Sequence, residues 1–134
     1  MRILLAAVLL LAAPSPAPAP APRMEKFELV FLRRPSAARD YPPAELDRIQ
    51  EAHLAHLGAM ARAGRMVVAG PLEDQPDKSL RGICLYRVGS IDGARKFAEA
   101  DPAVKAGRLQ VEVMTWWTQK GAMTFPVADQ LQKR

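Results

Sequence analysis

The feature that most constrains the fold is the order in which strand-like and helix-like periodicities follow one another. Residues 25–33 are rich in aromatic and β-branched residues and predict a strand, whereas residues 43–63 carry apolar positions at helical spacing. A glycine follows at position 64, which is typical of a helix end. The later segments predict two strands, a second helix and a last strand, at residues 65–71, 81–88, 91–100 and 108–117. Few topologies accommodate this order.

The β-α-β-β-α-β order is typical of the ferredoxin-like α+β fold, in which an antiparallel four-stranded sheet carries both helices on one face. Two short helices cannot cover every apolar side chain of the strands, which include Phe27, Val30, Val67, Tyr86, Val111, Val113, Trp116 and Trp117. A bare apolar sheet face predicts an interface, so we expect a homodimer that packs sheet against sheet. The length of 134 residues agrees with a single domain.

Both ends of the chain lie outside this pattern. Residues 1–22 contain the apolar run ILLAAVLLLAA and then alternating Ala and Pro, which is typical of a secretory signal. We therefore expect an exported protein, periplasmic or secreted, with a domain over residues 23–118 and a tail over residues 119–134. Translation from Met24 would instead give a cytoplasmic protein. No stable membrane span is expected, because a helix needs about 20 apolar residues to cross a bilayer.

The charge distribution, the single cysteine and the lack of known binding motifs exclude several classes of function. The 19 Lys and Arg residues are scattered with no run longer than two, whereas a nucleic-acid surface needs them clustered, so no nucleic-acid partner is expected. The single cysteine, Cys84, lies in an apolar run and predicts a small buried hydrophobic residue. The sequence lacks a phosphate-binding loop, a dinucleotide glycine fingerprint and zinc-ligand spacing, so neither a metal nor a cofactor is expected.

A histidine lies at the centre of the apolar stripe of the first predicted helix. At about 100° per residue, one face of that helix carries Leu46, Ile49, His53, Leu57 and Met60. An imidazole in this position is costly unless its ring nitrogens have partners. His53 is therefore either a core histidine bonded to a backbone carbonyl or a general acid/base in a pocket between helix and sheet.

The second interpretation needs a carboxylate that orients the ring, and Asp101 is the best-placed acid. It lies between the second predicted helix and a short turn at residues 102–106. An aspartate before proline is also a good N-cap for such a turn, so both roles remain open from the residues alone.

Two segments resemble the signatures of the YciI-like (YCII-related) family. AHLAHLGAMARAGRMVVAGPL has a His-Leu pair before a helix end, a glycine, a strand and Ala-Gly-Pro, and FAEADPAVKAGRLQVEVMTWW has Ala-Asp-Pro, Ala-Gly and a final strand ending near Trp. The resemblance covers about Glu25 to Trp117. It implies a ferredoxin-like domain that pairs as a dimeric α+β barrel, with a His–Asp pocket. The family residues fall on His53 and Asp101, and not on His56.

The leading hypothesis is a small cofactor-free enzyme that acts on a small organic molecule by proton transfer, as a lyase, an isomerase or a hydrolase. His53 would be the general acid/base, and Asp101 would hold its tautomer and stabilise the imidazolium. The residues alone do not decide between turnover and mere binding.

Substrate contacts and rival functions are also suggested. Arg62, Arg65 or the loop after Gly70 and Pro71 is expected to bind an anionic substrate. One alternative is a non-catalytic dimer that binds a small ligand. Another is a heme- or oxygen-dependent monooxygenase-like member of the dimeric α+β barrel group.

Overall fold

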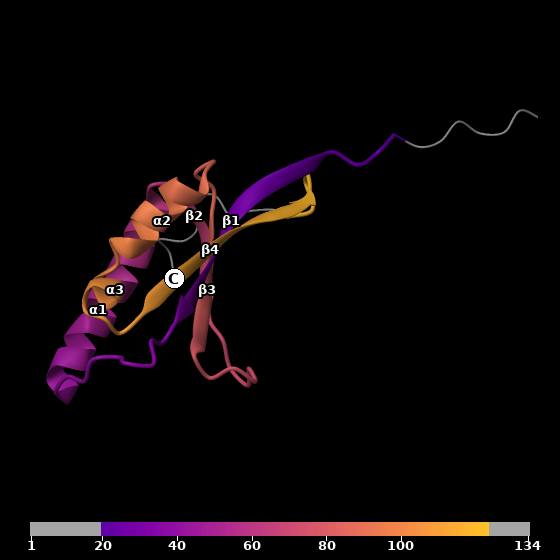
Figure 1. Cartoon of the computed structure of the whole chain (residues 1–134). Coiled ribbons are helices and arrows are strands. Elements are labelled where there is room, and N and C mark those ends of the chain that lie inside the picture. The colour runs from indigo at the N-terminus through magenta and orange to yellow at the C-terminus, as the bar shows by residue number, and fades with distance from the viewer. Residues whose placement is uncertain (1–19, 124–134) are drawn as a thin grey trace, which may run out of the picture.

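A computed structural model describes residues 20–123, in which four strands and three helices follow one another (Figure 1). They are β1 (Met24–Arg33), α1 (Pro43–Arg62), β2 (Met66–Pro71), β3 (Leu80–Tyr86), α2 (Ile91–Glu99), α3 (Pro102–Lys105) and β4 (Gln110–Gln119). This order confirms the predicted arrangement, with α3 as a short addition before the last strand. Residues 1–19 and 124–134, which hold most of the predicted leader and tail, lie outside the described part of the chain.

The strands form one antiparallel sheet in the order β2-β3-β1-β4. In the middle of β1, Val30 lies opposite Cys84 of β3 on one side and opposite Val113 of β4 on the other. With the helices gathered on one side of the sheet, this is the ferredoxin-like α+β topology, and the predicted fold class is confirmed (Figure 1).

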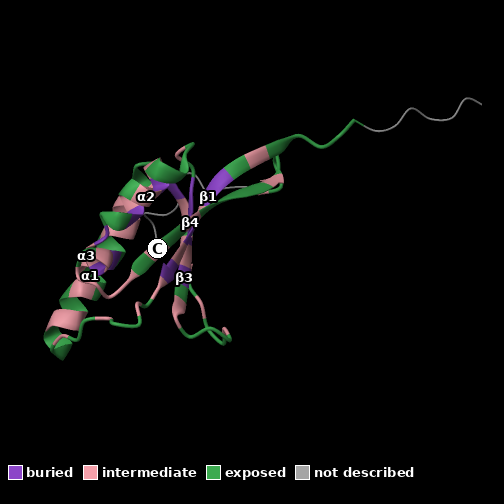
Figure 2. Ribbon diagram, viewed as in Figure 1, coloured by how far each residue is buried: buried purple, intermediate pink, exposed green. Residues whose placement is uncertain are grey.

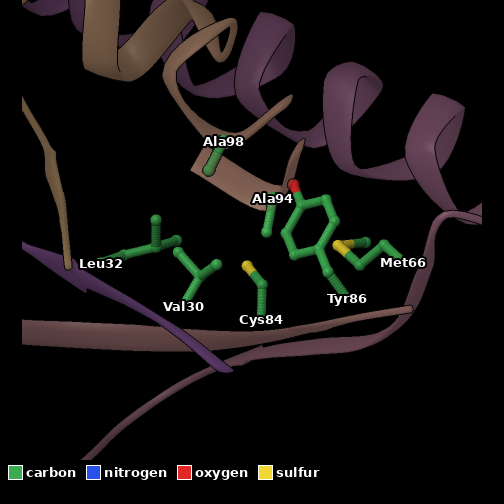
Figure 3. Packing of buried hydrophobic residues seen from close by; sticks show 7 residues of the cluster. All are labelled: Val30, Leu32, Met66, Cys84, Tyr86, Ala94 and Ala98. Carbon is green, nitrogen blue, oxygen red and sulfur yellow. The ribbon is translucent and has the colours of Figure 1, made fainter. Parts of the chain in front are cut away.

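The core fills the space between the sheet and the helices. Its buried members come from the strands and from α2, and they are Val30, Leu32, Met66, Cys84, Tyr86, Ala94 and Ala98 (Figure 3). Leu109, Val111 and Val113 pack against this cluster, which confirms that they share one face of the last strand. Figure 2 shows the buried positions where helices and strands face each other.

Local signals set the ends of the helices that carry the site. The first helix ends before Gly64, whose φ of 68° is in the left-handed region that favours glycine. The side chain of Ser90 accepts a hydrogen bond from the backbone N–H of Gly93 at 3.1 Å and so caps α2. The last strand continues to Gln119, two residues beyond its predicted end.

The sheet face opposite the helices carries exposed apolar side chains. The pairing of β1 with β4 places Met114 opposite Leu29 and Trp116 opposite Phe27. The exposed fraction is 56% for Val68, 40% for Met114 and 38% for Trp116. Single exposed apolar residues are ordinary, but a group on one sheet face is typical of an interaction surface. Within residues 20–123, no helix combines the length and the apolar character that a membrane crossing needs.

Candidate active site

A cavity of about 560 Å³ opens between α1 and the sheet. One wall comes from α1, and the opposite wall comes from the end of β2, the start of β3 and the end of β1. The segment after α3 completes the lining. Its apolar side chains include Leu46, Ile49, Leu57 and Leu109. A mostly apolar cavity with a few polar groups is the usual form of a small-molecule site.

His53 lies where the apolar stripe of α1 meets this cavity. It is the one residue of α1 that counts as buried, with 8% of its surface exposed, and it lines the cavity. The stripe predicted from helical spacing therefore places the imidazole between the core and the open space. His53 is not sealed inside the core.

The buried partner of His53 is Asp101. Nδ1 of His53 lies 2.6 Å from Oδ2 of Asp101, whose exposed fraction is 2%. The other carboxylate oxygen, Oδ1, accepts a hydrogen bond from the backbone N–H of Ala103 at 2.8 Å and caps α3. Asp101 thus contacts the imidazole of His53 and caps α3 at the same time. The short contact to the imidazole is typical of a charge-assisted hydrogen bond.

The contact fixes the tautomer of the neutral imidazole. A carboxylate can only accept, so Nδ1 of His53 carries the proton and Nε2 is left with a free lone pair. Within residues 20–123, every buried side-chain nitrogen and oxygen has a hydrogen-bond partner, whereas Nε2 of His53 has none. Nε2 is therefore accessible, and the accessible space beside it is the cavity.

Two buried groups near Asp101, the thiol of Cys84 and the hydroxyl of Tyr86, keep their protons. Burial, with a smaller contribution from the charge of Asp101, raises the pKa of the Cys84 thiol to about 12. Burial also raises the pKa of the Tyr86 hydroxyl. Cys84 is 1% exposed, which confirms the prediction of a small buried hydrophobic residue. A protonated thiol is a poor nucleophile, so Cys84 is inert in the cavity that it lines.

The second histidine has a different position. Nε2 of His56 lies 3.0 Å from the carbonyl oxygen of Phe97, so it donates to the backbone and ties α1 to α2. His56 does not line the cavity. The two histidines of the HLAH segment, three residues apart, are separated into a cavity residue and a structural one.

The expected substrate contacts divide into two groups. Gly70 and Pro71 line the cavity, whereas Arg62 and Arg65 do not. The guanidinium of Arg65 instead lies over the ring of Phe97, with Cζ 4.2 Å from the ring centroid. Three arginines that were not predicted from the sequence as substrate contacts also line the cavity, namely Arg34, Arg81 and Arg108.

Glycine makes the wall formed by β2 and β3 possible. A Cβ atom placed on Gly82 would lie 2.7 Å from the carbonyl oxygen of Gly70, which is closer than real Cβ atoms come. Gly82 therefore lets the two strands approach where they line the cavity. In the described part of the chain, no three His, Cys, Asp or Glu side chains gather so that they could hold a metal ion.

The chain is similar to one known protein family and to a solved structure. The family model of the YCII-related domain matches residues 29–117. Among solved structures, the chain is similar to 5-chloro-2-hydroxyhydroquinone dehydrochlorinase (TftG) from Burkholderia phenoliruptrix AC1100, solved in complex with 2,5-dihydroxybenzoquinone. The identity is 30% over 67% of this chain and 92% of that chain, with a TM-score of 0.43. Comparison with curated proteins finds no significant match.

Proposed function

Since the chain belongs to the YCII-related family, we propose that it is a cofactor-free enzyme that acts on a small organic molecule by proton transfer. His53 is the general acid/base, and Asp101 is the residue that orients it. One observation carries the proposal: the imidazole that lines the cavity is held at Nδ1 by a buried carboxylate at 2.6 Å. A core histidine would need neither the cavity nor the charged partner.

The geometry suits a single base that later acts as an acid. The free lone pair on Nε2 of His53 takes a proton from a substrate held in the cavity, and the ring becomes an imidazolium. The carboxylate of Asp101 then stabilises the new charge through the hydrogen bond at Nδ1. The N–H of Ala103 holds the other carboxylate oxygen, which keeps Asp101 from turning away. The imidazolium finally returns the proton to a leaving group or to another substrate atom.

The lining of the cavity disfavours a covalent intermediate on a hydroxyl, an amine or a thiol. Of the described residues that line it, none is Ser, Thr or Lys, and the thiol of Cys84 is protonated. Elimination, isomerisation and hydrolysis by an activated water each need only a positioned acid/base. This supports the lyase, isomerase and hydrolase classes.

The proposal extends to assembly and location. We propose a homodimer formed through the sheet face opposite the helices, supported by the exposure of Val68, Met114 and Trp116. We also propose that residues 1–22 direct export, on the strength of their apolar run and their Pro/Ala-rich end.

A turnover screen with matched histidine variants tests the proposed function. Wild-type protein is incubated with a panel of small organic acids and phenols, and consumption is followed by mass spectrometry. We expect His53→Gln to remove the turnover of any compound that the wild type consumes, and His56→Gln to retain it. Turnover that survives in His53→Gln would contradict the proposal. Folding of both variants is checked by thermal melting.

A further inference from the structure

Three arginines from segments far apart in the sequence line the cavity. Arg34 is the first residue after β1, Arg81 is the second residue of β3, and Arg108 lies between α3 and β4. Among the described residues that line the same cavity, Asp47 has the one carboxylate. The lining therefore has an excess of two positive charges. The His53–Asp101 pair lowers this excess by one when the ring is neutral and leaves it unchanged when the ring is protonated.

A β-bulge interrupts β3 at Arg81. Leu32 of β1 lies opposite Gly82, and Arg33 lies opposite Leu80, so Arg81 is the extra residue of β3. Regular alternation would place Arg81 on the same sheet face as Leu85, away from the helices. Bulges redirect side chains and are frequent beside active sites. Here the extra residue of β3 lines the cavity, as does Arg34 after the end of β1.

In the described part of the chain, two of the three arginines that line the cavity, Arg34 and Arg81, lack the carboxylate partners that the neighbouring Arg33 has. Arg33 is paired with Asp77 at 2.7 Å and with Glu112 at 2.8 Å. Within residues 20–123, the side chains of Arg34 and Arg81 have no hydrogen-bond or ion-pair partner. The third cation already has partners, because the guanidinium of Arg108 donates to the carbonyl oxygen of Arg39 at 2.7 Å and lies 3.7 Å from the carboxylate of Asp40. Two guanidinium groups are thus free to bind an anion.

From this arrangement we infer that the cavity selects a small organic oxyanion, either a carboxylate or an ionised phenol, with a largely apolar body. Arg34 and Arg81 bind the charged oxygens, for which the planar guanidinium is well shaped. The apolar side chains of Leu46, Ile49 and Leu57 contact the body of the molecule. The further step, that this anion is also the substrate on which His53 acts, rests on the proposed function.

Binding titrations with charged probes and neutral analogues test the inference. Benzoate is compared with benzamide, and 4-nitrophenolate is compared with 4-nitroanisole, by NMR titration of the full chain. We expect the wild type to bind at least one anion about tenfold more tightly than its neutral analogue. In the double variant Arg34→Gln/Arg81→Gln this preference falls to about twofold or less. Arg87→Gln is the matched control, because Arg87 is exposed and does not line the cavity.

The outcomes separate this inference from the proposed function. Equal affinity of the wild type for anions and neutral analogues would overturn the inference, as would an unchanged anion preference in the double variant. An anion preference that disappears in His53→Gln but persists in the double variant would assign the charge recognition to the imidazole. That result would also overturn the inference. Anion preference that His53→Gln retains supports the inference, even where the turnover screen gives no product and the proposed function fails.

Discussion

Nδ1 of His53 lies 2.6 Å from Oδ2 of Asp101, a contact between residues 48 positions apart in the chain. It joins the buried stripe of α1 to the N-terminus of α3 at the edge of the cavity. The same carboxylate caps α3 through the N–H of Ala103. The side chain of Asp101 thereby fixes both the start of α3 and the orientation of His53, the proposed base. Different substitutions of Asp101 can separate these two roles.

Asparagine and alanine at position 101 have different expected effects. Asp101→Asn keeps an oxygen that can cap α3, and we expect its free energy of unfolding to change by less than about 1 kcal/mol. It loses the charge that stabilises the imidazolium, so turnover falls by about 100-fold or more. Asp101→Ala loses the cap as well and is expected to be less stable by a further 0.5–2 kcal/mol, roughly. Urea unfolding and initial rates measure the two effects, and full activity of Asp101→Asn would contradict the assigned role.

The buried Cys84 thiol predicts a loss of stability at alkaline pH. Its pKa rises from 9.0 to about 12 in the folded protein, so the unfolded chain loses this proton first. Because the unfolded state then binds fewer protons, the free energy of unfolding falls as the pH rises above 9.0, and the fall continues toward 12. The contribution reaches about 1.4 kcal/mol per pH unit.

Urea unfolding of wild type and Cys84→Ala over this pH range isolates the effect. We expect a smaller alkaline slope in Cys84→Ala, whatever its absolute stability. Part of the slope should remain, because burial also raises the pKa of Tyr86. Identical slopes in the two proteins would show that the thiol is not protected from ionisation.

Much of the fold follows from periodicity and local capping. The spacing of Leu46, Ile49 and Leu57 placed His53 on the buried stripe of α1, and Gly64 marked a helix end that the structure confirms. These signals act within a few residues of each other, so they can be recognised in one sequence.

The arginines of the cavity could not be predicted in the same way. Arg34 and Arg81 come to one cavity only through the pairing of β1 with β3, and simple alternation along β3 is interrupted by a bulge at Arg81. Arg65 precedes β2, whereas Gly70 and Pro71 end it, and a strand separates its ends by about 3.3 Å per residue. Arg65 therefore lies at the other end of β2 from Gly70 and Pro71, and it packs on Phe97 instead of lining the cavity.

The exposed sheet face predicts dimerisation of the protein. We expect light scattering at micromolar concentration to give the mass of a dimer. Val68→Glu places a charge on the exposed face and should shift the protein toward the monomer. Ile91→Glu is the control, since Ile91 is an exposed apolar residue at the start of α2, away from the sheet. A monomeric wild type would contradict the proposed assembly.

Export is tested with a reporter that is active only outside the cytoplasm. Fused after Arg23, the reporter should be active when residues 1–22 are present and silent when they are removed. A silent reporter with the leader present, together with protein that starts at Met24, would establish the cytoplasmic alternative.

The central claim is that Asp101 holds His53 with the proton on Nδ1 and with Nε2 open to the cavity. The most direct test is the NMR signals of the imidazole nitrogens, recorded at a pH where the ring is neutral, in wild type and in Asp101→Asn. We predict a protonated Nδ1 and an unprotonated Nε2 in the wild type, and a change of the His53 signals in the variant that His56 does not share. A proton on Nε2 of His53, or signals of His53 that Asp101→Asn leaves unchanged, would contradict it.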